Sequence, residues 1–258
     1  MMRHAALYLR ASLTKSVILL RRYWFNTVSQ LVVTYVMFLL LVFGGRSIAP
    51  SVIQESLGGI IVGYFLWSTA VSSYRTPSSS LIGEARQGTL EQLSLSPLGI
   101  GRVVLLKTVA SLLVSVSLSM VILLSLLAIT GENLSLDFVA IVPILLLSIL
   151  SILGVGFALG GLALLYKRIS SALQIVQYLM IGLVAAPVES NPALKLLPLS
   201  LGSKLLRDVM TRGVGLFEIP TVDFALLVAT GVFYFGAGYL ALYWFKERAR
   251  DRGAMGHY

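Results

Sequence analysis

Residues 138–166 read FVAIVPILLLSILSILGVGFALGGLALLY, an apolar run that contains no carboxylate. A helix needs about 20 apolar residues to cross the hydrocarbon core of a bilayer, and this run is longer than that. Pro143 lies near its start, where a missing backbone N–H costs least. Gly156 and Gly160 have the spacing of a close contact between membrane helices. The run therefore predicts a membrane-spanning helix.

Five other apolar runs are also long enough to cross. They cover about residues 27–44, 57–74, 103–130, 169–187 and 222–245. The second run is stopped by Arg75 and Pro77, and its Gly59 and Gly63 predict the same kind of helix contact. The mean hydropathy is +0.89, and 12% of the residues are charged, against about 25% in soluble domains. We therefore expect one all-α transmembrane domain over residues 1–258, with six spans.

The basic residues indicate how these spans are oriented. With both termini in the cytoplasm, fifteen of the 20 Lys and Arg residues fall on the cytoplasmic side, which is the bias that membrane proteins show. The five external ones are Arg46, Lys195, Lys204, Arg207 and Arg212. This distribution explains the net charge of +9 without nucleic acid, so we expect a multi-pass protein of the cell membrane that binds none.

Two segments outside the spans have helical patterns. In residues 5–23, Leu9 and Leu13 begin an apolar stripe and the basic residues lie mostly elsewhere around the helix. This pattern is typical of an amphipathic helix lying among lipid headgroups, although a cytoplasmic extension of the first span would fit as well. In the external segment 188–221, a leucine-rich stretch predicts a short helix, which could be re-entrant, interfacial or simply on the surface. Its leucines on one side are Leu201, Leu205 and Leu206.

The groups that an enzyme or a proton-coupled carrier needs are missing from the spans. No carboxylate lies well inside them, both histidines lie at the termini, and the chain has no cysteine. A proton-coupled carrier usually needs a buried ionisable group, and an intramembrane enzyme needs an acid, a base or a metal. No Gly-Lys pair exists for a phosphate-binding loop. An intramembrane enzyme, or a secondary carrier or channel, is therefore the less favoured alternative. We expect no bound cofactor or metal, and a driving force from a partner.

Residues 84–99, EARQGTLEQLSLSPLG, interrupt the apolar pattern on the cytoplasmic side. Thr89 and Gln92 have the spacing of a capping box, and Glu91 carries a charge that suits the first turn of a helix. Pro97 biases the residue before it away from helix and so ends the element. The stretch therefore predicts a short, well-specified helix between the second and third spans.

This helix would run from Leu90 to Leu95 and expose Leu90 and Leu93 on one face. A helix of two turns is not stable alone, so it needs a surface to pack against. That surface is expected to be either lipid or a groove on a soluble partner.

Residues 84–98 resemble the cytoplasmic coupling segment of ABC transporter permeases of the type-two exporter class, which also lies between the second and third spans. The matching residues are Glu84, Gly88, Thr89, Leu90, Glu91, Gln92, Leu93, Pro97 and Leu98. The resemblance extends to the N-terminal helix, the six spans, the cytoplasmic ends and the long external segment. It implies an export permease that pairs with a second copy, here expected to be identical. Each copy would dock a separate ATP-binding subunit, and that subunit would bind the ATP and magnesium.

Polar and aromatic side chains inside the spans mark a candidate substrate path. In the fifth run, Gln174, Gln177 and Tyr178 follow i, i+3 and i+4 spacing and share one side of a helix. The other candidates are Tyr64, Trp67 and Ser68 in the second run and Ser111, Ser115 and Ser119 in the third. Small polar residues also form hydrogen bonds between membrane helices, which is the alternative. A mostly apolar and aromatic path favours an amphipathic or lipid-like substrate over an ion.

Overall fold

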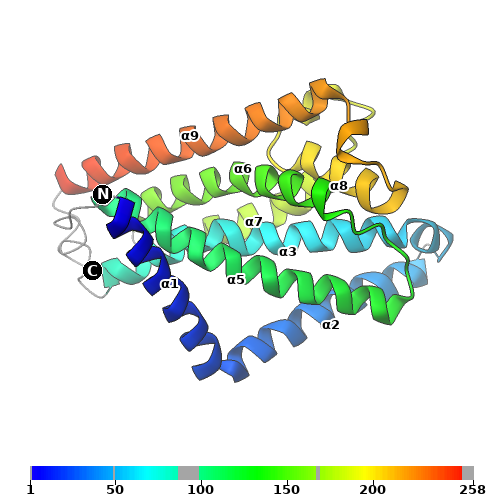
Figure 1. Cartoon of the computed structure of the whole chain (residues 1–258), viewed down its shortest axis with the longest axis horizontal. Helices are drawn as coiled ribbons and strands as arrows, with labels where there is room; N and C mark the ends of the chain where they lie inside the picture. Colours follow the sequence, from blue (N-terminus) through cyan, green and yellow to red (C-terminus); the bar gives the residue numbers. More distant parts are fainter. Residues whose placement is uncertain (1, 49, 87–98, 167–168, 252–258) are drawn as a thin grey trace.

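The computed structural model describes residues 2–48, 50–86, 99–166 and 169–251. Within those ranges every regular element is a helix, as the sequence predicts. In chain order they are α1 (Met2–Arg22), α2 (Trp24–Ile48), α3 (Pro50–Arg86), α5 (Gly99–Thr130), α6 (Phe138–Leu165), α7 (Ser170–Val184), the 3-10 helix η1 (Pro192–Leu196), α8 (Ser200–Arg212), the 3-10 helix η2 (Leu216–Glu218) and α9 (Thr221–Asp251). The predicted short helix after Gly88 lies outside the described residues. Helices α3, α5, α6 and α9 run roughly along one direction, whereas α1 crosses them steeply and α2 is inclined to them (Figure 1).

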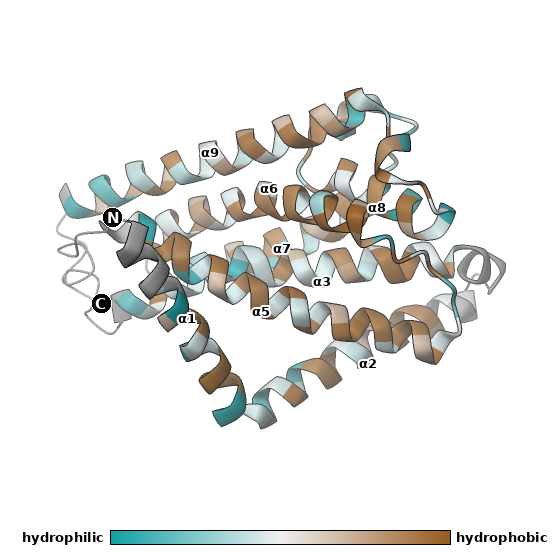
Figure 2. Ribbon diagram, in the orientation of Figure 1, coloured by the Kyte–Doolittle hydropathy of each residue, from teal (hydrophilic) through white to brown (hydrophobic). Residues whose placement is uncertain are grey.

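Five of the described helices are long and apolar enough to cross a membrane. Their candidate spans are Trp24–Gly45, Ser56–Glu84, Gly101–Thr130, Phe138–Leu165 and Thr221–Arg250. Hydrophobic residues cover the middle of these helices, and hydrophilic residues gather toward the two ends of the bundle (Figure 2). The chain is therefore a multi-pass membrane protein.

The run at residues 169–187 differs from the other five. It forms α7, which has only 15 residues and is about 22 Å long, against a hydrocarbon core of about 30 Å. The helix ends at Val184, where the backbone turns before Pro187. By length alone, the predicted fifth span is therefore too short to cross.

The two ends of the described chain lie at the same end of the bundle. The start of α1, the end of α3, the start of α5 and the end of α9 are all on the left in Figure 1, and α8 lies at the opposite end. This is the arrangement that two cytoplasmic termini require, while the side of the membrane itself stays a prediction.

Helix α6 is at the centre of the packing and contacts α3, α8 and α9. Glycines allow its backbone to approach its neighbours closely. A Cβ atom on Gly154 would lie 1.9 Å from the carbonyl oxygen of Tyr234 on α9, and one on Gly156 would lie 2.6 Å from that of Tyr74 on α3. Gly160 also faces α3. The close helix contact that the sequence predicts for Gly156 and Gly160 is therefore confirmed.

Helix α3 does not end at Arg75 and Pro77, where its apolar run stops, but continues to Arg86. A proline inside a helix removes a hydrogen bond and costs about 3 kcal/mol. Here Pro77 is buried, with its ring against Gly156, and the Ser78 hydroxyl donates to the Gly156 carbonyl oxygen at 3.0 Å. Packing on α6 therefore holds the helix together across the proline.

The segment that the sequence predicts to be external, residues 188–221, contains the predicted short helix, α8. Leu201, Leu205 and Leu206 are each at most 2% exposed and belong to the main hydrophobic core. Gly202 lies directly against Ser148 of α6. The leucine face therefore packs into the bundle and is not a solvent-facing surface.

Helix α1 covers the predicted N-terminal helix and crosses α5 obliquely (Figure 1). Leu13 and Leu20 are half-buried, Val17 is exposed, and the basic Arg10 and Lys15 are exposed. The helix itself agrees with the sequence, while its amphipathic character and its location among headgroups stay predictions.

Candidate functional site

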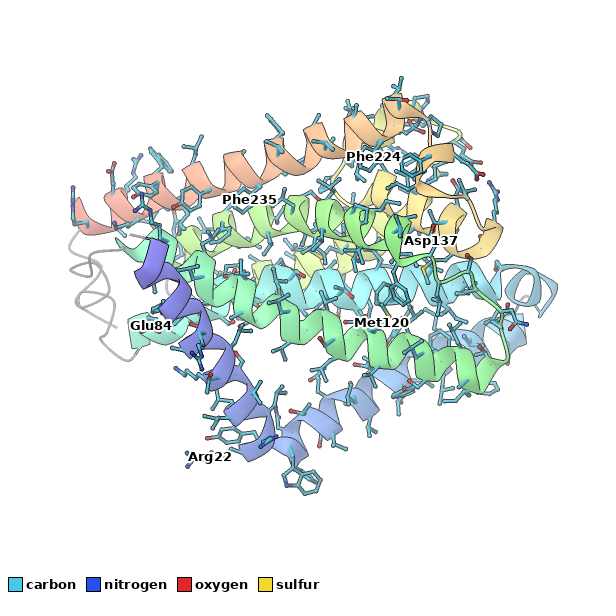
Figure 3. The ribbon with its side chains drawn as sticks, viewed as in Figure 1. Arg22, Glu84, Met120, Asp137, Phe224 and Phe235 are labelled. Carbon is cyan, nitrogen blue, oxygen red and sulfur yellow. The ribbon has the colours of Figure 1, made fainter. Side chains whose placement is uncertain are left out.

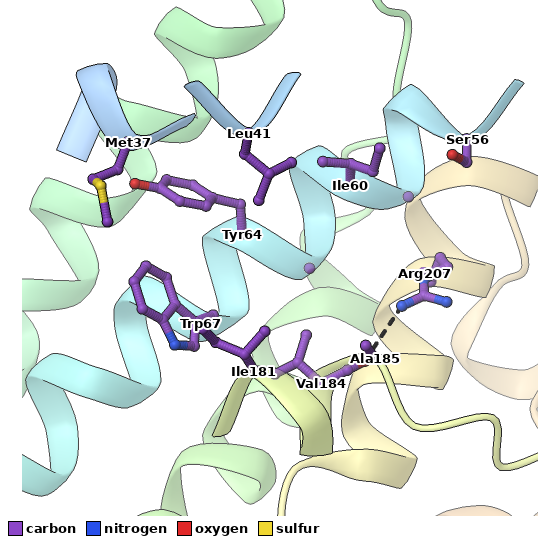
Figure 4. A pocket seen from close by; sticks show the side chains of 12 residues that line it. Met37, Leu41, Ser56, Ile60, Tyr64, Trp67, Ile181, Val184, Ala185 and Arg207 are labelled. Atoms are coloured by element: carbon purple, nitrogen blue, oxygen red, sulfur yellow. Dashed lines mark hydrogen bonds between the residues drawn. The ribbon is translucent and has the colours of Figure 1, made fainter. Parts of the chain in front are cut away.

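On α3, a second pair of glycines borders a hollow and not a neighbouring helix backbone. Gly59 and Gly63 line a cavity of about 720 Å³ that is bounded by α2, α3, α7 and α8 (Figure 4). A Cβ on Gly59 would lie 3.3 Å from the Arg207 side chain, and one on Gly63 would lie 3.4 Å from that of Val184. The helix contact that the sequence predicts at this pair is therefore made with side chains of α7 and α8, and not with a helix backbone.

We call this hollow the Arg207 cavity. Its other lining residues are Met37 and Leu41 from α2, Ser56, Ile60, Tyr64 and Trp67 from α3, Ile181, Val184 and Ala185 at the end of α7, and Arg207 from α8. Met37, Leu41 and Ile181 are each about half exposed on the outside of the bundle. The cavity therefore opens sideways, between α2 and α7.

A second hollow of about 390 Å³ adjoins the first and shares Met37, Tyr64 and Trp67 with it. We call it the Arg75 cavity, because Arg75 lines its far end. Its further polar lining residues include Gln30, Thr34, Ser68, Ser72, Ser115, Ser119 and Gln177. Gly59 and Arg75 are 16 positions apart on α3, or about 24 Å. The two cavities together thus form a groove along α3 with one arginine toward each end.

Two aromatic side chains separate the cavities and connect the walls of the groove. The rings of Tyr64 and Trp67 lie 5.5 Å apart, centroid to centroid. The Tyr64 hydroxyl donates to the carbonyl oxygen of Thr34 on α2, and the Trp67 indole N–H donates to that of Gln177 on α7 at 3.3 Å. Helix α3 therefore holds both flanking helices through this pair.

The structure brings six of the nine predicted path residues together, since Ser68, Ser115 and Ser119 line the Arg75 cavity with the three named next. Tyr64, Trp67 and Gln177 line the Arg75 cavity, while Gln174 and Tyr178 are exposed on the outside of the bundle. At 100° per residue, Gln177 is rotated by about 60° from Gln174 and by about 100° from Tyr178. Gln177 is therefore at one edge of the predicted face, and that edge lies against α3.

The two arginines of the groove differ in how their donors are used. Arg75 donates to the Gln177 side-chain oxygen at 2.7 Å and to the Tyr74 hydroxyl at 3.3 Å. Arg207 has a single long contact, from Nη2 to the Val184 carbonyl oxygen at 3.4 Å, and its Nε is buried without a hydrogen-bond partner. No ion pair within the described ranges involves Arg207.

The sequence places Arg207 on the predicted external side of the membrane and indicates no role for it. The available signal was its position four residues after Ser203, on the same face of a helix that buries its leucines. That pattern indicates a half-buried arginine but does not identify its neighbours. The cavity is visible only once α8 is seen to fold back against α3.

Of the predicted coupling residues, the structure describes Glu84, which lies at the other end of α3. Glu84 is on the last turn of this helix (Figure 3) and forms an ion pair with Lys107 of α5. The remaining residues of the prediction, from Gly88 to Pro97, lie outside the described residues. Glu84, which the resemblance assigns to partner binding, thus also joins the two helices that the segment connects.

Among the described residues, no three His, Asp or Glu side chains come close enough together to hold a metal ion.

Comparison with protein-family models, with curated proteins and with solved structures finds no match for this chain. The family resemblance therefore rests on the motif at residues 84–98 and on the order of the segments. The function has to be argued from these residues and from the geometry of the groove.

Proposed function

We propose that this chain is the membrane-spanning subunit of an ATP-driven exporter of the ABC type-two class. Two copies would associate in the cell membrane with all termini in the cytoplasm, and each would dock a separate ATP-binding subunit at residues 84–98. The groove along α3 would carry the substrate. ATP hydrolysis would take place in the partner.

The observation that carries this proposal is the junction between α3 and α5. Residues 87–98 connect these two helices, and the Glu84–Lys107 ion pair joins them directly beside that connection. Its side chains are only 17% and 23% exposed. Because packed helices move as rigid units, a push on the connecting segment would displace both helices together. A separate ATP-binding subunit needs such a joint displacement of two helices at the segment where it docks.

Six crossings require α7 to be one of them. In this proposal α7 crosses most of the bilayer, and the turn after Val184 with α8 fills the remaining depth. The packing of α8 supports this, because the Ser203 hydroxyl donates to the Val184 carbonyl oxygen at 2.7 Å. A helix that returns into the bundle on the external side would make 188–221 a partly re-entrant segment. Helix α1, with its basic exposed face, would lie among the cytoplasmic headgroups.

The test is whether an ATP-binding-cassette subunit copurifies with the tagged full chain from the membranes of its own host. Leu93→Asp places a charge on the predicted contact face, and we expect at least about tenfold less ATP-binding subunit to copurify, as for an interface hot spot. Ser94→Asp adds the same charge about 100° around the helix and should leave copurification unchanged. Gradient-driven flux or bond cleavage by this chain alone would instead support a carrier or an enzyme.

A further inference from the structure

We propose that the Arg207 cavity binds an amphiphile with an anionic head group. The head group would lie on the Arg207 guanidinium, and the apolar chain would extend past Gly59 and Gly63 toward Trp67. This names a class of cargo for the proposed exporter. It rests on the proposed function only in calling the ligand a cargo, since the binding itself needs no ATP-binding subunit.

The first argument is the charge of Arg207. Its neighbour Asp208 is already paired with Lys204 at 3.5 Å and with Arg212 at 3.0 Å. Glu132 approaches α3 at Gly58 and forms no ion pair with Arg207. Neither of these carboxylates therefore pairs with the Arg207 guanidinium, which lines the cavity and makes one long hydrogen bond, from Nη2. A planar guanidinium fits carboxylate and phosphate groups, which accept two parallel hydrogen bonds from it.

The second argument is how the side chain is held. The Arg207 stem lies on the bare backbone of Gly59, where a Cβ would be 3.3 Å from Cδ and 3.6 Å from Nε. Nη2 points toward the Val184 carbonyl oxygen at the end of α7 (Figure 4). The buried Nε has no acceptor, and leaving such a donor unpaired costs about 1–3 kcal/mol, or more for a charged group. An anionic ligand in the cavity would supply acceptors to the Nη atoms of the same guanidinium.

The third argument is the shape and lining of the rest of the cavity. Its volume of about 720 Å³ lies within the range of about 300–1,000 Å³ that small-molecule pockets occupy. Away from Arg207, the walls are mostly apolar, with Leu41, Ile60 and Ile181 among them. A free hydrated anion would gain nothing from these walls, whereas an acyl or similar chain would bury apolar surface there. The sideways opening between α2 and α7 gives such a ligand access from the bilayer.

The other arginine of the groove is less suited to this role. Arg75 already donates at 2.7 Å to Gln177, whereas Arg207 has only its long contact to a backbone oxygen. The head group is therefore assigned to the α8 end of the groove.

The test uses the full chain in detergent with Trp67 as the reporter. Trp24→Phe and Trp244→Phe leave Trp67 as the single tryptophan of the chain. Phosphatidylglycerol with brominated chains is expected to quench its fluorescence saturably, and diacylglycerol with the same chains is not. Arg207→Gln should weaken binding by roughly 10- to 100-fold, the value of hydrogen bonds to a charged group. Arg212→Gln, on the same helix with a side chain 67% exposed, should have no effect.

Three results would overturn the proposal: equal affinity with Arg207→Gln, equal quenching by diacylglycerol, or displacement of the lipid by millimolar inorganic phosphate. The last would assign the site to a small free anion. If Arg207→Gln does not fold, Arg207→Lys keeps the charge without the paired donors and should still bind several-fold more weakly. Gly63→Leu should reduce the affinity by filling the cavity while leaving Arg207 in place. None of these measurements involves an ATP-binding subunit, so their failure would leave the copurification result standing, and the reverse also holds.

Discussion

Helices α6 and α9 approach each other through two glycines, and replacing either by alanine should force the helices apart. A Cβ on Gly154 would lie 1.9 Å from the carbonyl oxygen of Tyr234, and one on Gly238 would lie 1.9 Å from the carbonyl oxygen of Gly154. Both obstacles are backbone atoms, which cannot rotate away as the end of a side chain can. Gly154→Ala and Gly238→Ala therefore each require a movement of a whole helix.

The size of that movement sets the expected loss of stability. Ordinary contacts of a Cβ begin at 3.4 Å, so each alanine requires a separation of about 1.5 Å, the difference from 1.9 Å. A gap of about 0.5–1 Å already removes roughly a quarter to a half of the dispersion attraction between touching atoms. Overpacked substitutions typically cost about 1–3 kcal/mol. Because α3 and α8 also pack on α6, we expect about 3 kcal/mol, or a melting temperature lowered by roughly 6–12 °C.

The measurement is thermal melting of the purified chain in detergent, followed by size-exclusion chromatography with fluorescence detection. Gly236→Ala is the matched control, since it lies on the same helix as Gly238 with no neighbouring atom within 4 Å of its Cβ position. Gly182→Ala on α7 is equally open. Both should melt like the wild type or slightly higher, because alanine favours a helix over glycine by about 1 kcal/mol. If Gly238→Ala melted together with Gly236→Ala, the close crossing of α6 and α9 would be refuted.

Two further predictions concern orientation and the junction. Because the chain has no cysteine, exposed single cysteines can report the sidedness: Ser190→Cys should react with an impermeant maleimide in intact cells, and Thr14→Cys only after permeabilisation. The reverse order would invert the topology and remove residues 84–98 from the cytoplasm. In a double-mutant cycle, Glu84→Gln and Lys107→Gln should show a coupling of about 0.5–1 kcal/mol in unfolding free energy. Strictly additive effects would show that this ion pair does not tie α3 to α5.

Run length and composition predict most of the helices because a long apolar segment has few alternatives in a membrane. The expected span 138–166 corresponds to α6, which ends one residue earlier. The start of α6 follows from local chemistry, since the Asp137 side chain accepts a hydrogen bond from the Val139 backbone N–H at 3.0 Å (Figure 3). The end of α3 could not be predicted in this way, because packing on α6 overrides the proline.

The glycine pairs show where sequence patterns stop being sufficient. Gly59 and Gly63 have the same four-residue spacing as Gly156 and Gly160, yet only the second pair meets another helix at backbone distance. The first pair lies under a cavity because α8 folds back against α3 and places Arg207 there. A local pattern indicates a bare stretch of helix surface, but the element that lies over it depends on contacts between residues far apart in the chain.

Helix α3 is the element that connects the proposed attachment site to the groove. It has 37 residues and is about 55 Å long. Gly59 and Glu84 are 25 positions apart on it, or about 38 Å. Pro77 lies between them, and sharp kinks in helices usually occur at proline. A flexible α3 would absorb a push at Glu84 before it reached the cavity.

Two observations argue against bending at this proline. Pro77 is buried against Gly156, and the next residue donates a hydrogen bond to the backbone of α6. Helix α6 in turn packs closely on α9, so α3 is supported on a broad, tightly packed unit. By contrast, α2 and α7 are joined to α3 by side-chain hydrogen bonds, from Tyr64 to α2 and from Trp67, Tyr74 and Arg75 to α7, and the Arg207 cavity lies between them at the Gly59 end. A displacement that reaches the groove should therefore shift α3 together with α6 relative to α2 and α7. That movement changes the width of the sideways opening, which is where an amphiphile would enter or leave.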